Sequence, residues 1–157
     1  MRVIGVDPGT IRVGWAVLEK EGNRIRVRGF GCIAAGRTGD PLTARAAAIT
    51  AGLDEVIASF APHCMALEEA FFGRSARSAL RIGEGRGFAI AAAARAGLAL
   101  HEYAPRTVKK SAVGTGSAHK SQVQEMMRRV LGLPALPEPE DAADALAVAW
   151  CHCNQLL

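Results

Sequence analysis

The chain has 157 residues and a formal net charge of +4. A chain of this length buries roughly two-thirds of its unfolded surface in one core, so we expect a single domain over residues 1–157. Hydrophobic residues make up 50% of the chain but aromatic residues only 5%, which favours packed helices over an all-β sandwich. The basic charge suits an anionic partner, but many soluble proteins without such a partner are equally basic, so charge alone selects no function.

No segment of the sequence predicts export or a membrane span. The longest apolar run, residues 88–94, is far too short to cross a bilayer. Asp7 interrupts the apolar run at the N-terminus, which argues against a signal peptide. The cysteines lie inside apolar segments and not at the loop positions of a disulfide framework, so we expect a reduced, cytoplasmic protein.

Histidine and cysteine positions suggest no zinc motif. Cys151, His152 and Cys153 are close in sequence, but residues two apart on a helix point to different faces, and no second ligand pair follows. We therefore interpret the cysteines as structural. His101 and His119 are scattered along the chain, and we assign no histidine to catalysis.

Three strands are predicted first, over residues 3–7, 13–18 and 24–33, joined by turn signals at Pro8-Gly9 and Glu21-Gly22-Asn23. Asp40-Pro41 then supplies an N-cap and a proline at the first helical position, and apolar residues keep helical spacing from Leu42 to Phe60.

The second part of the chain alternates strands and helices. We expect a strand over 63–69, an alanine-rich helix over 75–96, a fifth strand over 98–103, a helix whose apolar face runs from Val123 to Leu131, and a last helix over 141–153. This order predicts an α/β fold with a mixed five-stranded sheet, antiparallel at first, and helices on both faces.

Acidic residues occupy the positions at which sheets of this kind usually carry their ligand sites. Asp7 and Glu68 each end an apolar strand, and sites in these folds lie at the carboxyl ends of strands. Asp141 and Asp144 are three apart at the start of the last helix and share one face. Taken singly, each acid is also explained as a solvated charge or a helix cap, and for Asp141 capping is at least as good an explanation.

Together, these carboxylates predict a metal site. Carboxylates so close would repel one another unless cations neutralised them, and oxygen ligands select hard ions such as Mg²⁺ or Mn²⁺. Two such ions can activate a water on one side of a phosphodiester and stabilise the leaving oxygen on the other. We therefore expect phosphoryl-transfer chemistry at Asp7, Glu68, Asp141 and Asp144.

Aromatic and basic residues follow Glu68 directly. Phe71 and Phe72 precede Arg74, Arg77 and Arg81, which are spaced along one helix face and suit contact with a phosphate backbone and bases. A solvated charged face and core phenylalanines explain the same pattern.

Lysines and glycines supply two weaker signals. Lys109 and Lys120 flank a Gly-Thr-Gly-Ser loop and could approach the same anion, although a plain helix connection capped by Ser117 fits equally well. Gly83, Gly85 and Gly87 lie within a helix and indicate close helix packing, for which a dimer interface is one explanation.

The assembled motifs resemble the RuvC family of bacterial Holliday junction resolvases nearly from end to end. They are Gly-Val-Asp-Pro-Gly-Thr (5–10), Ala-Leu-Glu (66–68) with Phe71, Ser-Ala-Leu (78–80), Gly-Thr-Gly-Ser-Ala-His-Lys-Ser-Gln-Val (114–123) and Asp-Ala-Ala-Asp-Ala-Leu-Ala (141–147). The resemblance implies a ribonuclease-H-like fold, a homodimer, and Mg²⁺-dependent paired nicking of four-way DNA junctions in recombination and repair. It also implies cooperation with the RuvA and RuvB branch-migration proteins.

The resemblance also assigns residues. Asp7, Glu68, Asp141 and Asp144 match the metal-binding catalytic acids, Lys109 and Lys120 match DNA-contacting lysines, and Phe71 matches the aromatic near the junction centre. Arg74, Arg77 and Arg81 are expected to contact DNA from their charge pattern alone.

Three rival interpretations are weaker. Sugar kinases share the Asp-x-Gly turn but need a second lobe that 157 residues do not supply. A nuclease of the same fold that processes structured RNA would be similar in size and metal use, but the Asp141/Asp144 spacing and the match through Lys120 argue against it. A non-catalytic junction-binding protein would be expected to lack at least one acid, and all are present.

Overall fold

The structure is a computed structural model that describes residues 1–69 and 76–155, without the side chains of 76–78. Strands and helices follow one another as β1 (Arg2–Asp7), β2 (Arg12–Glu21), β3 (Arg24–Ala34), α1 (Leu42–Phe60), β4 (Cys64–Glu68), α2 (Ala76–Arg95), β5 (Ala99–Tyr103), α3 (Pro105–Val113), α4 (Lys120–Val130) and α5 (Glu140–Gln155).

The strands form one sheet in the order β3-β2-β1-β4-β5. The pairs β1–β2 and β2–β3 are antiparallel, whereas β1–β4 and β4–β5 are parallel. The predicted mixed five-stranded sheet is therefore confirmed. Because β1 and β4 are parallel neighbours with Val6 opposite Leu67, their carboxyl ends meet at the same edge of the sheet.

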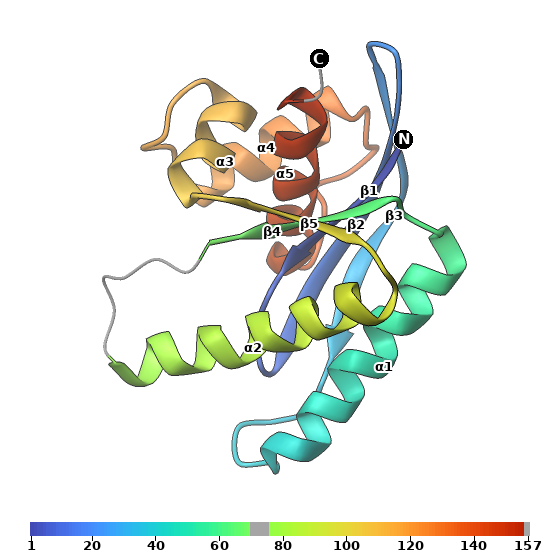
Figure 1. Cartoon of the computed structure of the whole chain (residues 1–157). Coiled ribbons are helices and arrows are strands. Elements are labelled where there is room, and N and C mark those ends of the chain that lie inside the picture. The colour runs from blue at the N-terminus through green and yellow to red at the C-terminus, as the bar shows by residue number, and fades with distance from the viewer. Residues whose placement is uncertain (70–75, 156–157) are drawn as a thin grey trace.

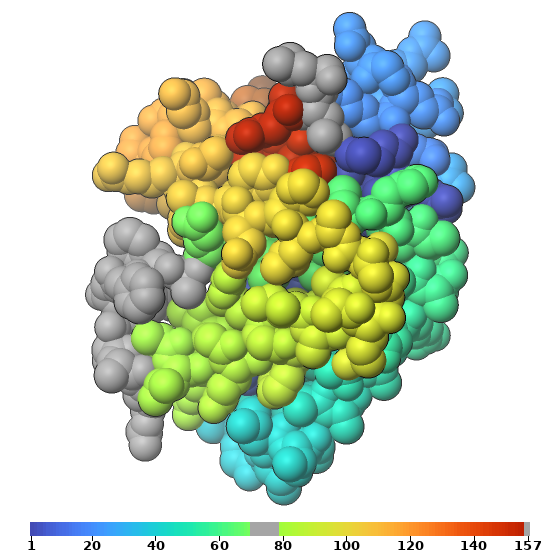
Figure 2. Space-filling model, in the orientation of Figure 1, coloured from blue at the N-terminus to red at the C-terminus, as the bar shows by residue number. Residues whose placement is uncertain are grey.

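Helices cover both faces of the sheet, with α1 and α2 on one side and α3, α4 and α5 on the other (Figure 1). The strands alternate accordingly: Ile4 and Met65 pack in the cluster beneath α1 and α2, whereas Val3 and Cys64 pack in the cluster beneath α5. The space-filling view shows that side chains close the gaps left between the ribbons (Figure 2).

Two glycines let α5 lie directly on the central strands. A Cβ at Gly5 would lie 2.3 Å from the carbonyl oxygen of Ala145, and one at Gly14 would lie 1.9 Å from that of Asp141. Any larger residue would push the helix away from β1 and β2. These glycines therefore bring the N-terminal turns of α5 beside the end of β1, where Asp7 lies.

Two local predictions were wrong. Helix α3 was missed, because a helix of nine residues that buries only Val108 and Ala112 offers too few apolar positions to establish a helical repeat in the sequence. The N-cap of α1 is Pro41 and not Asp40, whose carboxylate instead accepts a hydrogen bond from the backbone N–H of Arg37. The N-cap of α4 is His119, so Ser117, which was one of the explanations left open for this loop, does not cap it.

Among residues 1–69 and 76–155, none of the helices combines the length and the hydropathy that a membrane span needs.

Candidate active site

Asp7 occupies the last position of β1, directly after the fully buried Val6. Burial is the main reason why the pKa of its carboxyl is raised from 3.8 to about 7. Neighbouring charges contribute as well: those of Asp144, Glu68 and Asp141 raise this pKa, in decreasing order, and that of Lys120 lowers it. Asp7 thus lies within electrostatic reach of every other acid in the predicted cluster.

Glu68 holds the equivalent position on β4, the parallel neighbour of β1. Burial is again the first cause of its raised pKa, followed by the negative charge of Asp144. The positive charges of Lys120, Lys109 and Arg86 oppose that rise. The two lysines predicted to contact DNA therefore lie near Glu68.

Asp141 and Asp144 lie in the first turns of α5. Because the helix begins at Glu140, Asp141 is inside the helix and does not precede it as an N-cap would. Oδ2 of Asp144 accepts a hydrogen bond of 2.7 Å from Nζ of Lys120 on α4. Burial alone would lower the pKa of Lys120, but this bond and the charges of Asp144, Asp7 and Glu140 outweigh it, so the pKa is raised.

The four acids form a loose group and not a tight cage. In the described part of the chain, no three of them place a carboxylate oxygen each within 4.8 Å of one another. The donor set consists only of carboxylate oxygens, which fits hard divalent ions, and a cation would relieve the repulsion that raises the pKa of Asp7.

Arg86 on α2 is a residue that the sequence did not single out. Its guanidinium donates to the backbone carbonyl of Glu68 and pairs with the carboxylate of Glu102 on β5. The Arg86 side chain is only 13% exposed. A charged residue on the otherwise small, apolar buried face of this helix was the available signal, since such a residue needs partners nearby.

Gly85 explains how α2 reaches the site. A Cβ there would lie 2.8 Å from backbone atoms of Gly9, so the helix packs on the turn that follows Asp7. Close packing is confirmed for Gly85, whereas a Cβ at Gly83 or Gly87 would meet nothing within 4 Å among the described residues.

Of the remaining residues predicted to contact DNA, the structure describes some and not others. Arg81 is exposed on α2. Arg77 lies on the same helix, but its side chain is outside the description, and Phe71 and Arg74 lie outside the described residues altogether.

Comparison with known proteins identifies the family of this chain. The family model described as crossover junction endodeoxyribonuclease RuvC matches residues 3–152. The crossover junction endodeoxyribonuclease RuvC of Chloroflexus aggregans is 43% identical over 97% of this chain and 92% of its own length. That of Sodalis glossinidius is 46% identical over 97% of this chain and 86% of its own length.

Solved structures show that the fold of this chain is similar as well. T. thermophilus RuvC in complex with Holliday junction substrate superposes with a TM-score of 0.89 at 35% identity, over 97% of this chain and 92% of that one. The yeast mitochondrial Holliday junction resolvase Ydc2, at 15% identity and a TM-score of 0.64, shares the fold. The predicted ribonuclease-H-like architecture is thus confirmed, and this chain belongs to the RuvC family of crossover junction endodeoxyribonucleases.

Proposed function

We propose that this chain is a structure-specific endonuclease that resolves four-way (Holliday) DNA junctions by paired, symmetric nicks during recombination and repair. The observation that carries the proposal is that Asp7 and Glu68 end adjacent parallel strands while the start of α5, with Asp141 and Asp144, packs against β2 beside them. The charges of the other three acids, which raise the pKa of Asp7, support the same grouping. Family membership narrows the substrate, since relatives that match nearly the whole chain are crossover junction endodeoxyribonucleases.

In this proposal the four acids hold two Mg²⁺ ions, with Mn²⁺ as a substitute. When bound, such ions activate a water molecule and stabilise the leaving oxygen of a phosphodiester. The chain itself supplies charge and position. Asp7 and Glu68 are held at adjacent strand ends, Asp144 is oriented by Lys120, and the backbone of Glu68 is held by Arg86.

Lys109, Lys120 and Arg81 are proposed to bind the DNA backbone. The Lys120 side chain is 65% exposed even while it pairs with Asp144, so it can approach both the acids and an incoming phosphate. Arg74 and Arg77 are proposed to extend the same basic face, and Phe71 to stack on bases at the crossover.

Paired nicks imply a homodimer. Residues 1–157 are proposed to form one nuclease domain with one acidic site, and two strands cut symmetrically need two such sites related by a two-fold axis. Cooperation with RuvA and RuvB, and a cytoplasmic location, are further parts of the proposal that rest on the family resemblance.

The test compares substrates. The protein is incubated with Mg²⁺ and a four-way junction, a linear duplex of the same sequence, or a structured RNA, and the cuts are mapped. We expect symmetric nicks in the junction alone, with Asp7→Asn binding the junction but cutting none. Cleavage of the RNA in preference to the junction would favour the RNA-processing alternative, and junction binding without any cleavage would favour a non-catalytic role.

A further inference from the structure

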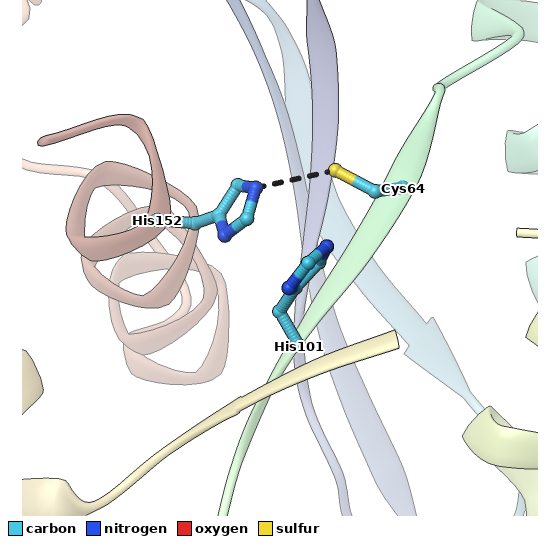
Figure 3. A group of neighbouring side chains, drawn as sticks. All are labelled: Cys64, His101 and His152. Carbon is cyan, nitrogen blue, oxygen red and sulfur yellow. Dashed lines mark hydrogen bonds between the residues drawn. The ribbon is translucent and has the colours of Figure 1, made fainter. Parts of the chain in front are cut away.

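A second group of potential metal ligands lies on the α5 side of the sheet. It consists of Cys64, His101 and His152, whose ligand atoms all lie within 4.8 Å of one another. The side chains point toward one another from two strands and a helix (Figure 3). No other three His, Cys or carboxylate groups in the described part of the chain are that close.

Strand pairing explains why these residues meet. Cys64 and Ala66 lie on the same face of β4, and both pack in the cluster beneath α5. His101 is paired with Ala66 on the neighbouring strand β5, beside Cys64 on that face. His152 comes down from the last turns of α5 and is only 3% exposed. Regular secondary structure therefore holds all three residues.

The distances suit a tetrahedral ion. Sγ of Cys64 lies 3.4 Å from Nε2 of His152. With a zinc–sulfur bond of about 2.3 Å and a zinc–nitrogen bond of about 2.0–2.1 Å, two ligands of a tetrahedral site stand roughly 3.5 Å apart. The ring of His101 lies 4.3 Å from that of His152, centroid to centroid, and His101 is exposed, so it can adjust and leave an entry path.

Tyr103 orients His152 as an outer partner of a metal ligand does. Its hydroxyl oxygen lies 2.6 Å from Nδ1 of His152. If the Nδ1–H donates to this oxygen, the lone pair on Nε2 points toward Cys64 and is available for an ion. Burial, followed by the charge of His101, lowers the pKa of His152 to about 4, so its ring is uncharged at neutral pH.

We propose that Cys64, His101 and His152 bind one zinc-class divalent cation, with water as the fourth ligand. Binding forms a bond from the ion to the sulfur and breaks the S–H bond of the Cys64 thiol, whose proton leaves to solvent, with no change in oxidation state. Thiolate and imidazole ligands prefer Zn²⁺ or Co²⁺ to Mg²⁺, so this site differs in chemistry from the acidic group.

The two sites lie at opposite ends of shared elements. Cys64 and Glu68 are the first and last residues of β4, about 13 Å apart at about 3.3 Å per residue. Asp144 and His152 are separated by about 12 Å along α5 at about 1.5 Å per residue. A cation at the thiol–imidazole group would thus clamp α5 to β4 and β5 at the end remote from the acids.

Cobalt is the probe for this site. Apoprotein titrated with Co²⁺ should develop a thiolate-to-cobalt charge-transfer band that saturates at one ion per chain, persists in excess Mg²⁺ and disappears on addition of Zn²⁺. Cys64→Ser should abolish the band, whereas Cys32→Ser, which removes a thiol elsewhere, should retain it. Absence of the band in the parent, or its survival in Cys64→Ser, would overturn the proposal.

Two milder variants keep the proposal testable if Cys64→Ser fails to fold. His101 is exposed, so His101→Asn should fold normally, yet it should lose more Co²⁺ affinity than the roughly 10-fold to 100-fold expected of Tyr103→Phe, which removes only the outer partner. Zn²⁺ should raise the melting temperature of the parent but not of His101→Asn. Unchanged Co²⁺ affinity in both variants would show that these side chains form only a packing cluster. These readouts use no DNA, so they are independent of the nuclease proposal.

Discussion

Nζ of Lys120 lies 2.7 Å from Oδ2 of Asp144. The same lysine lowers the pKa of both Asp7 and Glu68. A single cation at the start of α4 thus acts on acids carried by β1, β4 and α5, and it keeps more of them ionised than their burial alone would allow.

Loss of this lysine should move the pH dependence of cleavage. In Lys120→Met the pKa of Asp7 and of Glu68 rises, so the carboxylates that must bind metal ionise only at higher pH, and the acid limb of the pH–rate profile shifts upward. Lys110→Met, at an exposed position on α3, should leave that limb in place. An acid limb in Lys120→Met that coincides with the parent's would contradict the electrostatic role.

The raised pKa of Asp7 also predicts a stability effect in metal-free protein. The folded carboxyl holds its proton up to about pH 7, whereas the unfolded one loses it near 3.8, so stability is lost as pH rises between these values. Asp7→Asn removes this loss and should be more stable than the parent at pH 8, by on the order of 4 kcal/mol, but nearly equal at pH 4.

Denaturant unfolding in EDTA at the two pH values measures this difference, and added Mg²⁺ should narrow it by stabilising the parent alone. Asp54→Asn, which breaks an exposed pair with Arg95, is the control and should change stability by less than about 1 kcal/mol. Equal stabilities of parent and Asp7→Asn at pH 8 would refute the prediction.

Arg86 should matter more than Arg95 on the same helix. Arg86→Met removes the hydrogen bond to the Glu68 carbonyl and the ion pair with the Glu102 carboxylate, and we expect a loss of about 1–3 kcal/mol in the free energy of unfolding. Arg95 is 49% exposed, so Arg95→Met should cost no more than about 1 kcal/mol. Chemical denaturation of both variants measures the two losses in stability. Equal losses would show that the contacts of Arg86 contribute no more to stability than the exposed pair of Arg95.

Gly14→Ala should separate α5 from β2. Its new methyl group would collide with the carbonyl oxygen of Asp141, which should cost about 1–3 kcal/mol and reduce cleavage, because Asp141 moves with the helix. A Cβ at Gly87 would meet no atom of the described residues within 4 Å, so Gly87→Ala should instead stabilise α2 by about 0.5–1 kcal/mol. Melting temperatures and junction cleavage rates test both; a Gly14→Ala protein as stable and active as the parent would disprove the packing argument.

Junction binding should depend on Arg81 in a way that salt reveals. If Arg81 contacts a phosphate, Arg81→Ala reduces the slope of log affinity against log salt by about one unit. Arg95→Ala, at the other end of α2, should leave the slope unchanged. Binding titrations at several salt concentrations measure this slope. Equal slopes for the parent and Arg81→Ala would show that Arg81 is an ordinary solvent-exposed residue that contacts no phosphate.

Local patterns singled out the four acids, for a physical reason. A short buried strand is apolar throughout, so a carboxylate that ends it, as Asp7 and Glu68 do, stands out against its neighbours. Helical spacing likewise placed Asp141 and Asp144 on one face. Parallel crossover connections then bring strand ends to one edge of the sheet, so even the meeting of the acids could be expected.

Sequence spacing does not specify which residues meet through strand register and helix docking, although a lone charge on a buried helix face, such as Arg86, signals that it needs a partner. Arg86 meets the Glu68 carbonyl only because Gly85 lets α2 pack on the turn after β1. Cys64, His101 and His152 lie far apart in the chain, and only the pairing of β4 with β5 and the seating of α5 on the sheet bring them together. Sequence spacing encodes contacts within one element, whereas contacts between elements depend on how their surfaces pack, which no single segment specifies.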